Sequence, residues 1–63
     1  MKRTMELQRK IYDDTMTTAE RLNININTVT VWVKRGLLPA PIRIGCQKFY
    51  QRDLVEEYLA RGQ

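Results

Sequence analysis

The sequence contains no histidine and only one cysteine, Cys46. A chain with one thiol and no imidazole builds neither an internal disulfide nor a Cys/His zinc site. The same absences remove common nucleophiles, bases and metal ligands of enzymes, so we expect no catalytic activity, no metal and no cofactor. We expect Cys46 to be exposed at a turn, in a reducing cytoplasm.

Long apolar runs are also missing. No stretch approaches the ~18 apolar residues of a membrane span, and residues 1–8 lack the apolar middle of a signal peptide. We therefore expect a protein without membrane contact that stays inside the cell. Its 63 residues predict one domain, and a chain of this size buries only ~60% of its unfolded surface. That leaves no room for a substrate cleft with catalytic machinery.

Acidic residues are absent from the middle of the chain. Eleven Lys and Arg residues against seven Asp and Glu residues give a net charge of +4. Between Arg21 and Arg52 there are six basic residues, counting both ends, and no acidic one. Such an electropositive block indicates a polyanionic partner.

The first ten residues offer little to bury. Only Met5 and Leu7 are apolar apart from the initial methionine, and four residues are basic. We interpret residues 1–10 as a flexible basic N-terminal arm and residues 11–63 as the folded domain.

Capping residues then mark two short helices. Asp14 or Thr15 is placed to cap the first helix, and Asn23, which tolerates positive φ, to end it. Ile24 fills the junction and Asn25 caps the second helix. Two short helices joined in this way form a helix-turn-helix.

Residues 23–36 fit two periodicities. Polar and apolar residues nearly alternate from Asn23 to Thr30, and five of the apolar residues up to Val33 are β-branched, which favours a strand. A helix would also give them one buried face, made of Ile26, Val29, Trp32 and Val33. The capping asparagines at the start, Lys34 and Arg35 at the end and Gly36 as a left-handed stop favour the helix. We predict a helix over residues 26–35.

Prolines after Gly36 prevent the helix from continuing. Strands over residues 42–44 and 48–50, joined by a turn with Gly45, then predict a hairpin, or wing. Of the adjacent rings Phe49 and Tyr50, we expect one in the core and the other partly exposed. A last helix over residues 51–61 has an apolar side made of Leu54, Val55, Tyr58 and Leu59. The expected fold is mainly α with a small β-hairpin: a winged helix-turn-helix of three helices plus one wing.

This order of signals, over about three quarters of the chain, resembles the small winged helix-turn-helix proteins of mobile elements. These are the AlpA-like prophage regulators and excisionases, which are related to the MerR DNA-binding domain. The most specific block is Thr28-x-x-x-Trp32-Val-Lys-Arg-Gly36 followed by Leu38-Pro39 and a glycine-turned hairpin. Further matching residues are Ala19, Leu22, Ile24, Asn25, Val29, Pro41, Ile42, Arg43, Ile44, Gly45, Phe49, Tyr50, Asp53, Leu54, Tyr58 and Leu59. The chain departs from such proteins at Asn23, at Asn25 and at the wing tip.

The resemblance implies a sequence-specific DNA-binding protein of a phage or integrative element in a prokaryotic cytoplasm, acting as an excisionase, a transcriptional regulator or both. A site-specific integrase is a further candidate partner. We expect a monomer in solution that associates cooperatively on double-stranded DNA.

The expected DNA contacts fall on the second helix and the wing. Basic side chains would bind phosphate, with Arg52 as a further candidate, while Asn27 would contact adenine, Thr30 a base edge and Val31 a thymine methyl. Asn25 and Thr28 would hold the DNA backbone, and Gln47 would project from the wing. The full set is Asn25, Asn27, Thr28, Thr30, Val31, Lys34, Arg35, Arg43, Gln47 and Lys48.

Two other functions fit the residues. The basic face could bind an acidic protein, as a phage-encoded inhibitor or a terminase small-subunit-like assembly factor. Alternatively, residues 23–33 could form a β-ribbon that reads DNA in a dimer, although the prolines after Gly36 interrupt the helices that such a fold requires.

Overall fold

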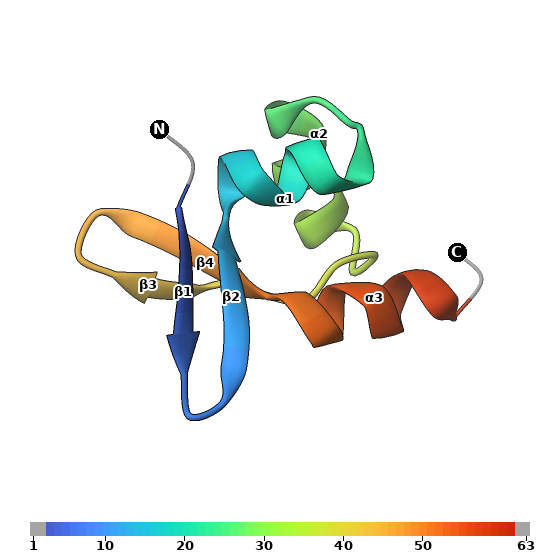
Figure 1. Ribbon diagram of the computed structural model, residues 1–63. Helices are drawn as coiled ribbons and strands as arrows, with labels where there is room; N and C mark the ends of the chain where they lie inside the picture. The colour runs from blue at the N-terminus through green and yellow to red at the C-terminus, as the bar shows by residue number, and fades with distance from the viewer. Residues whose placement is uncertain (1–2, 62–63) are drawn as a thin grey trace.

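A computed structural model describes residues 3–61, which form three helices and a four-stranded sheet (Figure 1). The sheet is antiparallel with strand order β1-β2-β4-β3, so the two edge strands are β1 and β3. The elements, in chain order, are β1 (Thr4–Leu7), β2 (Lys10–Asp14), α1 (Thr15–Leu22), α2 (Ile26–Lys34), β3 (Ile42–Ile44), β4 (Gln47–Gln51) and α3 (Arg52–Ala60).

The expectation of a mainly α fold with one hairpin is wrong, because a second hairpin precedes α1. Residues 4–10, assigned above to a flexible arm, form β1, a two-residue turn and the start of β2. Residues 1–2 of that arm lie outside the described residues. The protein is therefore an α+β fold in which the wing is one half of a larger sheet.

The turn of the added hairpin explains why its sequence was misleading. Gln8 and Arg9 both have positive φ, 54° and 69°. Two-residue turns of this geometry usually contain asparagine, aspartate or glycine, since other side chains crowd the backbone there. Glutamine and arginine are not typical of such turns, so the sequence of this segment does not predict a hairpin.

Two buried aspartates attach β1 to the rest of the domain. Thr4 Oγ1 donates a hydrogen bond of 3.0 Å to Asp13 Oδ1. The Arg3 backbone N–H donates to Asp14 Oδ2 at 3.0 Å, and the Asp14 N–H donates to the Arg3 carbonyl at 3.0 Å. The polar side chains thus hold the first hairpin in register where little apolar surface is available.

The cap at Asp14 is confirmed, because its Oδ1 accepts a hydrogen bond of 2.8 Å from the Thr17 N–H. Helix α1 ends at Asn23, whose φ of 57° is left-handed, as expected. The Asn23 and Ile24 N–H groups donate back to the last carbonyls of α1. Asn25 then caps α2, so three residues join the helices and fix the helix-turn-helix.

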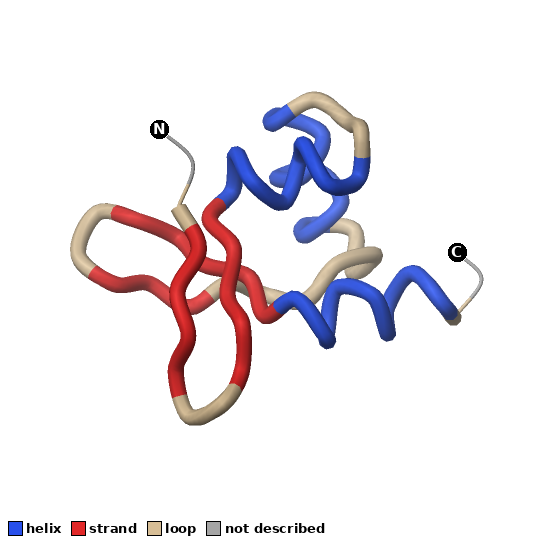
Figure 2. Tube along the Cα trace, in the orientation of Figure 1, coloured by secondary structure: helices blue, strands red, loops and turns tan. Residues whose placement is uncertain are grey.

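The prediction of a helix over residues 26–35 is confirmed to within one residue: α2 covers Ile26–Lys34 (Figure 2). Gly36 has a φ of 79° and donates to the Val33 carbonyl, while the Leu37 N–H donates to the Trp32 carbonyl. This paired pattern closes a helix at a left-handed glycine. The capping interactions at the two ends of α2 outweigh the strand preference of its β-branched residues. The interpretation of this segment as a β-ribbon is therefore wrong.

The core lies between the helices and one face of the sheet. It consists of Ala19, Val29, Leu38, Tyr50 and Val55, with Leu22, Ile24, Trp32, Val33 and Leu59 packed against it. Three expectations fail here. Leu54 and Ile26, expected on buried faces, are 36% and 41% exposed, and neither Phe49 nor Tyr50 is partly exposed. Phe49 is buried as well as Tyr50, because β4 is a central strand and Phe49 lies between Asp14 of β2 and Ile42 of β3.

We expect the double substitution Gln8→Asn with Arg9→Gly to raise the free energy of unfolding by about 1–2 kcal/mol, because asparagine and glycine accept positive φ with less strain. Chemical denaturation measures this change. Arg9→Ala is the matched control, since it removes the charge and keeps the strained turn. An unchanged or lower stability of the double variant would contradict the first hairpin.

Candidate nucleic-acid interface

Helix α2 turns one side to the core and the other to solvent. Val29 is fully buried, and Trp32 and Val33 pack against the core. The expectation that the opposite side points outward is confirmed by the exposed side chains of Asn27, Thr30, Val31, Lys34 and Arg35.

Two of the candidate residues, Asn25 and Thr28, lie at the start of α2. Asn25 Oδ1 accepts a hydrogen bond of 2.8 Å from the Asn27 N–H, so this oxygen already has a structural partner. Thr28 is half-buried on the flank of the helix. Asn25 is therefore first a helix cap, and a contact to DNA would come in addition.

The wing carries two basic residues directly opposite each other. Arg43 of β3 pairs with Lys48 of β4 in the antiparallel register, and both are exposed. Like charges at such a position repel each other, which disfavours the hairpin unless an anion lies between them. Gln47, opposite Ile44, is half-buried and points to the other face of the sheet.

Strand alternation places the wing charges on the helix side of the sheet. Lys48 and Tyr50 are two residues apart on β4, so their side chains share a face. Tyr50 belongs to the core that the helices cover. Arg43 and Lys48 therefore lie on the same side of the sheet as the helix layer, where the wing extends beyond it (Figure 1).

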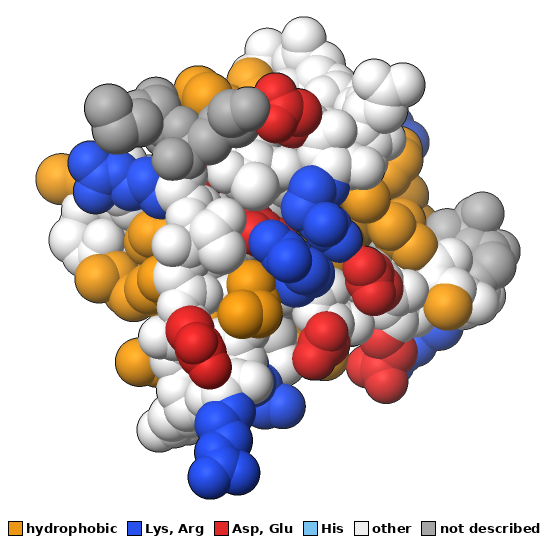
Figure 3. Space-filling model, viewed as in Figure 1, with side chains coloured by type: hydrophobic (Ala, Val, Ile, Leu, Met, Phe, Trp, Pro, Cys, Tyr) orange, Lys and Arg blue, Asp and Glu red, His pale blue; other side chains and the backbone are white. Residues whose placement is uncertain are grey.

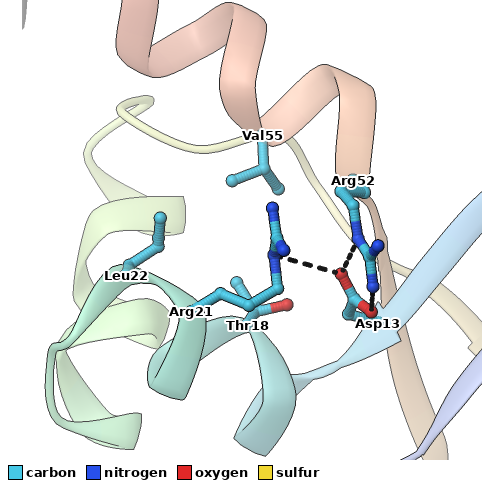
Figure 4. A pocket seen from close by; sticks show the side chains of 6 residues that line it. All are labelled: Asp13, Thr18, Arg21, Leu22, Arg52 and Val55. Atoms are coloured by element: carbon cyan, nitrogen blue, oxygen red, sulfur yellow. Dashed lines mark hydrogen bonds and ion pairs between the residues drawn. The ribbon is translucent and has the colours of Figure 1, made fainter.

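The face shown in Figure 3 has mixed charge: basic and acidic side chains are neighbours in its centre, between α1 and α3. Here the acidic residues neutralise two arginines. Arg52 Nε and Nη2 donate to the two oxygens of Asp13 at 2.9 and 2.7 Å. Arg21 Nε lies 3.7 Å from Asp13 Oδ2 (Figure 4). Arg21 Nη2 also forms an ion pair of 2.9 Å with Glu56 Oε2.

This arrangement corrects the suggestion that Arg52 binds phosphate, because its guanidinium is fixed on Asp13. Sequence reasoning missed this pair, because Asp13 and Arg52 are far apart in the chain. They meet only because β2 pairs with β4, the strand that leads into α3. The only signal was the pair of adjacent aspartates at the end of a β-branched and aromatic run, which were interpreted as caps alone.

The remaining basic residues of the middle segment are unpaired. Within residues 3–61, ion pairs to acidic side chains occupy Arg21 and Arg52, while Lys34, Arg35, Arg43 and Lys48 make none. The fold thus gathers acidic partners around α1, β2 and α3 and leaves uncompensated positive charge on the end of α2 and on the wing.

Asp13 is the centre of the ion-pair cluster and is 2% exposed. Burial alone would raise the pKa of its carboxyl, but hydrogen bonds from Arg52 and Thr4 and the charges of Arg52 and Arg21 hold the pKa below its usual value. The small pocket around it is lined by Asp13, Thr18, Arg21, Leu22, Arg52 and Val55 (Figure 4). The charged side chains of Asp13, Arg21 and Arg52 line this pocket and pair with one another, so we interpret the pocket as part of the structure and not as a ligand site.

Residues 3–61 contain no group of three Cys, Asp or Glu side chains placed to hold a metal ion. Nor does any helix in this range combine the length and apolar character of a membrane span. No protein-family model, curated protein or solved structure matches the chain at a significant level.

We expect Asp13→Asn to lower the free energy of unfolding at pH 7 by about 2 kcal/mol, because it leaves the guanidinium groups without their anion. Glu56→Gln, which removes an exposed partner of Arg21, is the matched control and should cost less than about 0.5 kcal/mol.

The stability contributed by Asp13 should also depend on pH. A carboxyl whose pKa is lowered by folding stabilises the protein above its unfolded pKa of about 3.9, and this contribution is lost as the pH falls further. Urea unfolding of both proteins between pH 5 and 2 should therefore show the gap between wild type and Asp13→Asn narrowing below about pH 4. A constant gap would contradict the charged cluster.

Proposed function

We propose that the protein binds double-stranded DNA, with the outward side of α2 in the major groove and the β3–β4 wing on the flanking minor groove or backbone. The observation that carries this proposal is the set of four unpaired cations at the end of α2 and on the wing: Lys34, Arg35, Arg43 and Lys48. A helix-turn-helix whose second helix is capped, exposed and free of acidic residues supports the same function.

Binding begins with charge. The four cations replace counterions condensed on the phosphates, a contribution that does not depend on base sequence and that salt weakens. The opposed pair Arg43 and Lys48 gains most from an intervening phosphate, because the anion removes their mutual repulsion. The polar side chains of α2 then meet base edges, which gives the protein its sequence specificity.

The biological setting follows from the resemblance to AlpA-like regulators and excisionases. The protein acts on the DNA of a phage or integrative element, in the cytoplasm of a prokaryotic host. It changes the direction of recombination together with an integrase, regulates neighbouring genes, or does both. The protein is a monomer in solution and associates cooperatively with further copies when it binds repeated sites on DNA.

The double variant Lys34→Ala with Arg35→Ala should lose at least tenfold in affinity for a random-sequence duplex, because it removes about half of the phosphate contacts. The matched control is Arg9→Ala with Lys10→Ala, which removes the same charge from the β1–β2 hairpin. Fluorescence anisotropy at several salt concentrations measures both. Equal losses in the two variants would show that only net charge matters and would contradict the proposed surface.

Salt dependence provides a second readout in the same titrations. Neutralisation of four phosphates gives a slope of log K against log salt of about −4, and the Lys34/Arg35 variant should reduce it to about −2. Affinity that is insensitive to salt would reject DNA binding through these cations. An acidic protein partner remains the alternative if the duplex does not bind at all.

A further inference from the structure

Val31 stands in the middle of the outward side of α2. Successive helix residues are turned by about 100°, so Asn27 and Lys34 lie one turn before and one turn after Val31 on the same side. Val31 is 43% exposed, although its neighbours on this side are polar or basic. An apolar side chain is thus displayed inside a polar stripe.

Helix formation does not explain these residues. Exposed helix positions favour alanine, glutamate or lysine, and valine, threonine and asparagine are poorer helix formers. Asn27, Thr30 and Val31 all belong to the poorer class and occupy the solvent side of the same helix. The exposed part of the Val31 side chain is apolar surface that is available to a partner.

The major groove offers a matching pattern. The thymine C5-methyl is an apolar group in that groove, and it lies beside the hydrogen-bonding edges of adenine and thymine. Within residues 3–61, the side chains of Asn27 and Thr30 have no hydrogen-bond partner. Asn27 and Val31 are separated by about 6 Å along the helix axis, close to two base-pair steps of about 3.4 Å.

We propose that Val31 determines specificity by contacting a thymine methyl, while Asn27 binds an adenine about two base pairs away. This inference rests on the proposed function and narrows it to targets with A·T pairs at both positions. It also favours DNA over RNA, because uracil lacks the methyl and the major groove of an RNA helix is too narrow for side-chain reading.

The test removes single methyl groups from the ligand. The best-binding duplex is selected from a random-sequence pool, and each thymine is replaced in turn by deoxyuridine. At one position the wild type should lose about fourfold in affinity, the value of one buried methyl. Val31→Ala should bind the thymine and deoxyuridine forms of that position equally well. Leu54→Ala, an exposed apolar residue of α3, is the control and should keep the fourfold difference.

The outcomes separate the two proposals. If the wild type binds duplex but no deoxyuridine substitution weakens it, or if Val31→Ala keeps the fourfold difference, the inference fails and DNA binding stands. If no duplex from the pool binds, both proposals fail. Circular dichroism verifies that Val31→Ala remains helical, as the higher helix preference of alanine predicts.

Discussion

The buried carboxylate of Asp13 is the interaction on which the arrangement of the domain depends. It accepts hydrogen bonds from Thr4 of β1 and Arg52 of α3 and lies beside Arg21 of α1, so one side chain joins the added hairpin to two helices. A small domain buries little apolar surface. The ion pairs and hydrogen bonds of Asp13 therefore fix the positions of its elements where the hydrophobic core alone does not. The cluster also determines the surface charge. Because it fixes two arginines, the unpaired positive charge of the middle segment is confined to α2 and the wing.

Local signals in the sequence were sufficient for the helices. The N-caps at Asp14 and Asn25 and the left-handed residues Asn23 and Gly36 define α1 and α2, although the β-branched residues of α2 favour a strand. The wing was also predictable, since Gly45 supplies a positive φ at its turn. These features depend on neighbours in the chain, which is why they could be read without knowledge of the tertiary structure.

The sheet could not be predicted in the same way. Its first hairpin turns at Gln8 and Arg9, residues that rarely accept positive φ, and its register is fixed by buried aspartates that look like caps alone in the sequence. The outward residues of α2 were predicted because helical spacing assigns each residue to a side. The sequence did not predict that Arg52 is unavailable to phosphate, because its partner Asp13 is distant in the chain and is brought close only by the pairing of β2 with β4.

An amide chemical-shift titration of the isotope-labelled protein with a short random-sequence DNA duplex at low salt tests directly whether α2 and the wing bind DNA. We expect the largest shifts in residues 25–36 and 42–48, which carry the unpaired cations, and small shifts throughout α3, where acidic residues concentrate. Shifts centred on α3 or on the β1–β2 hairpin, or no shifts at all, would contradict a DNA-binding surface formed by α2 and the wing.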